Sequence, residues 1–232
     1  MAAYQIRDSE TGKILLNYTD LLKERFIFIR SMDIQELYDI PDASILPNLH
    51  TEVALGYVGR SSVHSLTTLK NTDTGIELAR NVMQTIAVDK KTLKPSAVPT
   101  WWREQYVDKT IERPSRRVNA FHVPDQTYSY EMKVPGCEID RWQHTNYSSY
   151  TRFCFNAAMD AMRAGFYSTF LRDDDILSYN VMRMSPVYHG DSRAGDIILI
   201  RTWENENNPY LLHFDFSKDG KTCYQNSVEF YK

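Results

Sequence analysis

The chain has 232 residues and a formal net charge of −3, with 42% hydrophobic and 25% charged residues, which is typical of a globular protein of one large or two small domains. This charge balance lacks the basic surface that nucleic-acid binding requires, and no apolar run reaches the roughly 18 residues that span a bilayer. The three cysteines have no C-x-x-C spacing, which argues against a disulfide framework or a cysteine-based zinc site. We therefore expect a cytoplasmic location, and the first residues, MAAYQIRDSETG, show no secretory signal.

The N-terminal half is predicted to hold one helix followed by strands. The sequence NYTDLLKERFIFIRSM (residues 17–32) is typical of a helix. Alternating patterns then predict strands over residues 51–58, 61–70 and 76–88, with NTDTG as the hairpin turn between the last two. Residues 103–125 are charged and contain two prolines, so we interpret them as a linker that crosses the surface.

The C-terminal half shows the same order more clearly. Residues 147–165 place apolar side chains along one face of a helix, and Gly165 stands where that helix would end. Beyond it the period changes to two, and the turn compositions HGD, NENN and KDGK separate the predicted strands, which are residues 176–188, 196–205, 209–217 and 223–231. The Asp-Gly of SKDGKT is a strong hairpin signal because glycine supplies the positive φ of a tight turn.

The two halves align weakly with each other. When residues 8–26 are laid on residues 138–155, the acid pairs and the Asn-Tyr dipeptides fall in the same order, ahead of the predicted helix in each half. The pairs are Asp8 and Glu10 on Glu138 and Asp140, and Asn17-Tyr18 on Asn146-Tyr147. The sequence therefore predicts two copies of one helix-plus-sheet unit, at residues 1–110 and 125–232, joined by a linker at 111–124.

The stretch before the second helix, CEIDRWQHTNYSSY, crowds acids, amides and a histidine at one helix entrance. Thioesterases of the hotdog fold carry the pattern D-x-D-x-x-x-H-x-N-N-x-x-Y at this place. This chain keeps the spacing with Glu138, Asp140, His144, Asn146, Tyr147 and Tyr150. It thus resembles the 4-hydroxybenzoyl-CoA and acyl-carrier-protein (ACP) thioesterases, and its repeat looks like the tandem hotdog of the plant and bacterial acyl-ACP enzymes.

The resemblance implies an α+β fold, a tandem hotdog in which each unit wraps a curved antiparallel sheet around a long central helix. It also implies hydrolysis of an acyl-CoA or acyl-ACP thioester, a reaction of lipid metabolism. In that role Asp140 is the carboxylate, while His144 and Asn146 orient water or the thioester. Backbone amides near Asn146 and Tyr147 would polarise the carbonyl. Glu138, Trp142, Tyr147 and Tyr150 are the predicted substrate-binding residues of this half.

A structural interpretation of the same residues stays open. Polar side chains before a helix commonly act as caps that stabilise it by about 1 kcal/mol, and Thr145, Asn146 or Asp140 would suffice for that. Two departures from the plant-type pattern also matter. Trp142 stands where those enzymes place an asparagine, and residues 182–191 lack their Glu-Cys pair.

Two functions therefore remain open. The protein is either a thioesterase or a non-catalytic protein that binds a hydrophobic or aromatic small molecule in the tunnel of the hotdog fold. Dehydration of a hydroxyacyl thioester is a weaker third option. Arg60, in GYVGRSS, is a candidate contact for a pantetheine phosphate, and the basic run RPSRR is a candidate contact for an acyl carrier protein. We expect no cofactor and no metal site, because the histidines lack ligand spacing, and a homodimer is an open possibility.

Overall fold

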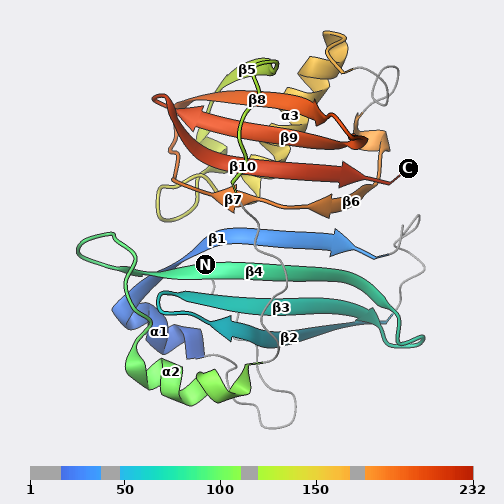
Figure 1. Ribbon diagram of the computed structural model, residues 1–232. Helices are drawn as coiled ribbons and strands as arrows, with labels where there is room; N and C mark the ends of the chain where they lie inside the picture. Colours follow the sequence, from blue (N-terminus) through green and yellow to red (C-terminus); the bar gives the residue numbers. More distant parts are fainter. Residues whose placement is uncertain (1–16, 38–47, 111–119, 168–175, 232) are drawn as a thin grey trace.

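The computed structural model describes residues 17–37, 48–110, 120–167 and 176–231. Ten strands in these residues belong to one antiparallel sheet, in which nine follow the order β2-β3-β4-β1-β6-β10-β9-β8-β5 and β7 pairs with both β1 and β10. The N-terminal strands form one end of this sheet and the C-terminal strands the other (Figure 1). No helix in the described ranges is long and apolar enough to cross a membrane.

The N-terminal half is a four-stranded sheet with a short helix before it. Its elements are α1 (Tyr18–Glu24), β1 (Arg25–Glu36), β2 (Leu49–Val58), β3 (Ser62–Asn71) and β4 (Glu77–Asp89). The three strands predicted at 51–58, 61–70 and 76–88 are confirmed, with boundaries shifted by one or two residues. The turn at NTDTG closes through Asn71, whose side chain accepts the backbone N–H groups of Asp73 and Thr74.

The helix predicted over 17–32 is wrong beyond Glu24. The backbone turns extended at Arg25 (φ −133°, ψ 151°), and residues 25–36 pair along their whole length with β4. The run Phe26-Ile27-Phe28-Ile29 is aromatic and β-branched, which favours a pleated strand over a helix. The predicted long central helix of this half is therefore only seven residues in the described part of the chain.

The predicted linker over 103–125 is also wrong at its start. Residues 100–106 form α2 (Thr100–Tyr106), followed by the 3₁₀ turn η3 (Val107–Lys109). Trp102 is fully buried, and with Tyr106 it packs into the N-terminal core beside Leu21 and Val58. Burial of these two aromatic side chains holds this part of the chain against the N-terminal core. Residues 111–119 lie outside the described residues.

The C-terminal half is a curved sheet packed on one long helix. Its elements are β5 (Tyr128–Lys133), η4 (Gly136–Glu138), α3 (Ser149–Arg163), η5 (Ile176–Ser178), β6 (Val181–Met184), β7 (Val187–Tyr188), β8 (Ile197–Asn205), β9 (Asn208–Lys218) and β10 (Lys221–Phe230). The helix predicted at 147–165 is confirmed within two residues at each end, and Gly165 ends it with a positive φ of 69°. Strand β5 was missed by the sequence analysis.

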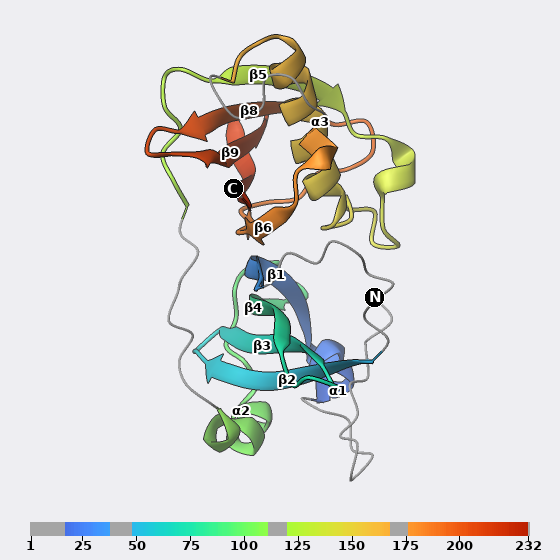
Figure 2. The same cartoon turned by 90° about the vertical axis from the view of Figure 1, so that its right-hand side faces the viewer.

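Helix α3 lies against one face of the curved C-terminal sheet (Figure 2). Its buried face includes Cys154, Ala157, Ala158 and Ala161, whose small side chains let the helix approach the strands closely. The opposing sheet residues are large and apolar and are almost fully buried: Ile198, Ile200, Leu212, Phe214, Phe216, Tyr224, Val228 and Phe230. This core fixes the entrance of α3 relative to the strand ends around it.

Strand β1 joins the two halves into one sheet. It pairs with β6 through Ile34 and Met184 and with β7 through Ser31 and Val187. The single strand predicted at 176–188 is split into β6 and β7 at Ser185-Pro186, because proline has no N–H to donate, and the Pro186 carbonyl instead accepts the Met32 N–H. The strands of both halves therefore belong to one continuous sheet.

Candidate functional site at the entrance of helix α3

Asp140 closes the loop that leads into α3. Its Oδ1 accepts the backbone N–H groups of Trp142 (2.8 Å) and His144 (3.2 Å), and its own N–H donates to the His144 carbonyl at 2.8 Å. Gln143 takes a positive φ of 65° at the tip, and Ile139 bridges to Thr145 at the base. A short acid at position 140 therefore has a structural role in this loop.

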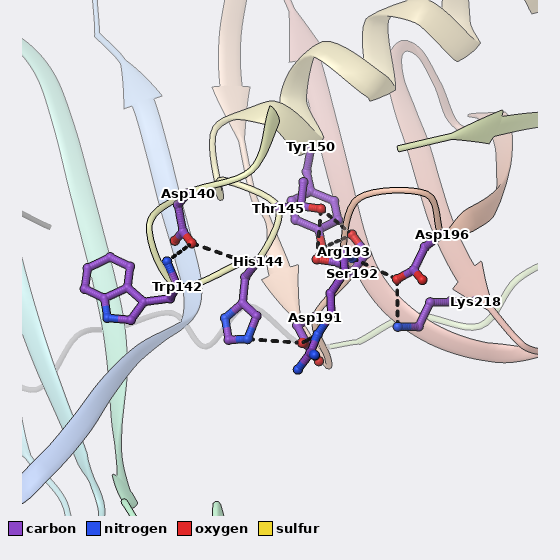
Figure 3. Close-up of polar contacts among 10 residues, drawn as sticks. All are labelled: Asp140, Trp142, His144, Thr145, Tyr150, Asp191, Ser192, Arg193, Asp196 and Lys218. Atoms are coloured by element: carbon purple, nitrogen blue, oxygen red, sulfur yellow. Dashed lines mark hydrogen bonds and ion pairs between the residues drawn. The ribbon is translucent and has the colours of Figure 1, made fainter. Parts of the chain in front are cut away.

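His144 lies between this loop and the segment that follows β7 (Figure 3). Its Nε2 is 3.4 Å from Oδ2 of Asp191, and the Arg193 Nε is 3.6 Å from the same oxygen. The imidazole is part-exposed and the carboxylate is half exposed, so water reaches both. The structure thus brings together a histidine and an acid that are 47 positions apart in the sequence.

Ser192 ties the segment carrying Asp191 to the helix entrance. Its carbonyl accepts the backbone N–H and the Oγ1–H of Thr145, at 2.8 and 3.0 Å. Its Oγ lies 2.7 Å from Thr145 Oγ1 and 2.8 Å from the Tyr150 hydroxyl. Thr145, Ser192 and Tyr150 are all buried, and burial raises the pKa of Tyr150 to about 12, so its hydroxyl stays protonated at neutral pH.

Asn146 and Glu138 stabilise the first turn of α3. The Asn146 Oδ1 accepts the N–H and Oγ–H of Ser148, and the Asn146 N–H donates to the Glu138 carbonyl at 2.8 Å. The Glu138 carboxylate accepts the Ser149 hydroxyl at 2.6 Å and pairs with Arg152. The hydrogen bond from Ser149, with the Arg152 contact, holds the pKa of Glu138 below its usual value. The backbone amide of Asn146 is thus already used and cannot also polarise a bound carbonyl.

The three aromatic residues predicted to bind substrate differ in exposure. Trp142 and Tyr147 are 44% and 48% exposed and flank the loop, with the Arg141 guanidinium 4.2 Å from the Trp142 ring centroid. Tyr150 is buried and stacks on Tyr224 with 4.7 Å between centroids. The two exposed rings are accessible to a ligand, whereas the Tyr150 ring is enclosed in the core.

Arg60 lies in the other half of the molecule. It occupies the turn between β2 and β3, and its carbonyl accepts the Val98 N–H. It lines a hollow with Ser61, Asp89, Thr92, Pro95, Ser96 and Ala97. Within the described ranges, no hydrogen bond or ion pair joins Arg60 to the helix-entrance residues.

The sequence analysis missed most of the residues that hold the site: Asp191, Ser192, Arg193, Ser149 and Arg152. The only signal was the turn composition HGD, which predicts a turn but not a partner for His144. No group of three or more His, Cys, Asp or Glu side chains with metal-binding geometry occurs in the part of the chain that the structure describes.

Neither known protein families nor curated protein sequences match this sequence. Solved structures do match. A 12:0-ACP thioesterase from Umbellularia californica is 13% identical, with a TM-score of 0.70 over 95% of this chain and 79% of that one. An acyl-ACP thioesterase from Bacteroides thetaiotaomicron is 14% identical, with a TM-score of 0.66 over 90% of this chain and 78% of that one.

The chain has a hotdog fold. The match extends over both halves, since each of these similar structures covers at least 90% of the chain. In this hotdog protein, α3 is the long helix against the sheet, and the acid, histidine and amide of the sequence motif lie at its N-terminal end.

Proposed function

We propose that this protein hydrolyses an acyl thioester, carried by coenzyme A or by an acyl carrier protein, at the entrance of α3. The observation that carries the proposal is the loop 138–146, in which Asp140 is hydrogen-bonded to the His144 backbone directly before the long helix of a hotdog fold. The names of the similar structures, which are acyl-ACP thioesterases, support the same reaction. The proposal includes a tandem arrangement in which each half is one hotdog unit.

The reaction adds water to the thioester carbonyl. A C–O bond forms, the C–S bond breaks, and the thiol leaves with the proton that the water gave up. Asp140 takes that proton. Both loop bonds of its carboxylate go to Oδ1, and we assign Oδ2 to the water. His144 and the side-chain amide of Asn146 orient the water and the thioester, and the positive end of the α3 dipole stabilises the negative charge that develops on the carbonyl oxygen.

The remaining predicted residues act around this centre. Trp142 and Tyr147 are exposed beside the loop and contact the incoming substrate. Glu138 and Tyr150 hold the first turn of α3 through Ser149 and Ser192. A contact between Arg60 and a carrier phosphate remains a proposal for the other half of the molecule.

Replacing Asp140 by Asn tests the proposal sharply. Asn keeps an oxygen that accepts the two backbone N–H groups, so the loop shape is retained while the charge is lost. Hydrolysis of a panel of acyl-CoA and acyl-ACP thioesters should fall at least about 100-fold, the usual scale for loss of a general base. The matched control is Asp8→Asn, the counterpart in the sequence repeat, which has no histidine at the equivalent place and should leave the rate unchanged. Equal rates for D140N and wild type would contradict the assignment.

The second candidate function is non-catalytic binding of a hydrophobic or aromatic ligand. The exposed Trp142 ring, with Arg141 against it, favours this alternative because the ring offers a stacking surface at the mouth of the site. Calorimetric titration with apolar and aromatic ligands separates the two. A wild-type protein that binds such a ligand but hydrolyses no thioester in the panel has the binding function.

A further inference from the structure

Asp191 and His144 form a pair whose partner atoms are defined. Figure 3 shows the imidazole with Nε2 directed to the Asp191 carboxylate, 3.4 Å away, and the other ring nitrogen directed away from it. At this ion-pair distance the negative charge of the Asp191 carboxylate favours a proton on the nearer ring nitrogen, Nε2. In a neutral imidazole the other nitrogen, Nδ1, then carries the lone pair.

We propose that Asp191 holds His144 in the tautomer protonated on Nε2, so that Nδ1 accepts a hydrogen bond from the attacking water, and that Ser192 positions Asp191 for this. This inference rests on the proposed thioester hydrolysis and adds a second carboxylate to it. Asp140 takes the proton, and the oriented His144 fixes the direction from which the water attacks. Asp191 and Ser192 are positioning residues because they act through His144.

The bonds of Ser192 explain why a half-exposed carboxylate holds a defined place. Asp191 is 52% exposed in its side chain and would be free to turn if its backbone moved. Ser192, next to it, is fully buried and is bound to Thr145 through both its carbonyl and its hydroxyl, and to Tyr150 through the hydroxyl. Thr145 directly follows His144, so one cluster of bonds fixes both members of the pair.

The other end of the segment is fixed separately. Asp196 accepts the Arg193 N–H at 2.8 Å and pairs with Lys218 at 2.9 Å. The charged groups around the pair are Asp140 on the loop of His144, Arg193 beside Asp191, and Lys218, which interacts electrostatically with Asp191. Because Asp196 holds this segment, the control for Asp191→Asn is Asp125→Asn: Asp125 is exposed, precedes β5, and makes no hydrogen bond or ion pair to His144 or Asp191 within the described ranges.

The experiment measures the tautomer and the rate independently in the full-length protein. Nitrogen-15 NMR of the histidine ring, with His144 assigned by its loss in His144→Gln, reports which nitrogen carries the proton. In wild type and D125N the Nε2–H form should dominate. In D191N the fraction of the Nε2–H form should fall, and kcat should fall roughly 10-fold with KM little changed. This is less than the 10⁴-fold loss shown by a buried carboxylate in a catalytic triad, because Asp191 is half exposed.

Ser192 is tested with two variants, because Ser192→Ala in a buried cluster also risks misfolding. Tyr150→Phe removes one hydroxyl bond to Ser192 and keeps the ring in its stack. Both variants should weaken the Nε2–H preference and lower kcat in the same direction as D191N, with Tyr150→Phe the smaller change.

An unchanged His144 tautomer in D191N would overturn the inference, even if wild type hydrolyses thioesters. Conversely, a wild type without hydrolysis overturns the proposed function alone, because the NMR result still decides whether Asp191 sets the tautomer.

Discussion

Asp140 shows how one side chain at the helix entrance can serve both structure and chemistry. Its Oδ1 shapes the loop by accepting two backbone N–H groups, one of them from His144, and its Oδ2 takes part in neither of these bonds. These bonds shape the loop and do not cap α3, whose N-cap residue is Ser148, and this structural role is compatible with the proposed catalytic one. A substitution separates them only if it keeps the acceptor and removes the charge, which is what Asn does and Ala does not.

Glu138 should make stability depend on pH in the acid range. Its pKa is lower in the folded protein than its usual 4.5, because it accepts the Ser149 hydroxyl and pairs with Arg152. A depressed carboxyl pKa stabilises the fold above pH 4.5, and this contribution is lost as the pH falls below that value. Glu138→Gln should therefore lower the free energy of unfolding at pH 7 by at most about 1 kcal/mol, and the difference from wild type should shrink toward pH 3.5 in urea titrations. A difference that is the same at both pH values would contradict this account.

His213 should also make stability depend on pH, at pH values between about 4 and 6.5. Burial lowers its pKa from 6.5 to about 4, and the Asn205 amide lies 3.2 Å from a ring nitrogen that accepts only while neutral. Between these values the unfolded chain binds a proton that the folded chain does not, so wild type should lose stability as the pH falls from 6.5 toward 4, with a slope of at most about 1.4 kcal/mol per pH unit. His213→Gln, which keeps polar contacts to Ser227 and Asn205, should flatten this slope in thermal unfolding. An unchanged slope would show that His213 titrates normally.

At the level of elements, β1 is the strand on which the two halves depend. It is paired on both sides, with β4 along its length and with β6 and β7 on the other edge. Asp33 on β1 is buried and receives the Arg183 guanidinium from β6 and the Ser185 hydroxyl. The backbone ladder between β1 and β6 is short, so this ion pair is a main polar contact across the junction.

Breaking that pair should destabilise the protein strongly. Arg183→Ala leaves the Asp33 carboxylate buried without its cation, and we expect a loss of about 3 kcal/mol in the free energy of unfolding. The control is Arg80→Ala, which removes an exposed ion pair with Glu77 and should cost less than about 1 kcal/mol. Denaturant unfolding of both variants measures the difference. Equal losses would mean that Asp33 finds water once Arg183 is removed.

At the scale of the whole molecule, the continuous sheet makes each half depend on the other. Removal of β1 would leave β6 and β7 as an open edge and would expose Asp33's partners, Arg183 and Ser185, to solvent. Residues 125–232 expressed alone should therefore aggregate or associate, which size-exclusion chromatography with light scattering would show. A monodisperse, folded monomer of this fragment would contradict the dependence.

Much of this fold could be predicted where local pattern and tertiary environment agree. Helix α3 has a regular apolar face and a glycine after its end, and the hairpin between β9 and β10 has an Asp-Gly turn, so both were located within two or three residues. Strand β1 could not be located from periodicity, because a short apolar run such as RFIFIR suits a buried helix segment as well as a strand, and its aromatic and β-branched content is the only local signal for a strand. Backbone pairing with β4 and β6 makes this segment a strand in the structure.

The same distinction holds for the site. The sequence by itself determined α3 and the order of the strands after it, and the spacing that places Asp140, His144 and Asn146 on one loop before α3, because residues so close in sequence cannot be far apart in space. Only the tertiary structure decided which carboxylate faces His144. Asp191 reaches it because Ser192 binds Thr145 and Tyr150 across more than forty residues of chain, a contact that depends on how the strands after α3 fold back over its entrance. The local sequence therefore sets which side chains lie on the loop before α3, whereas the packing of the core sets which distant residues contact them.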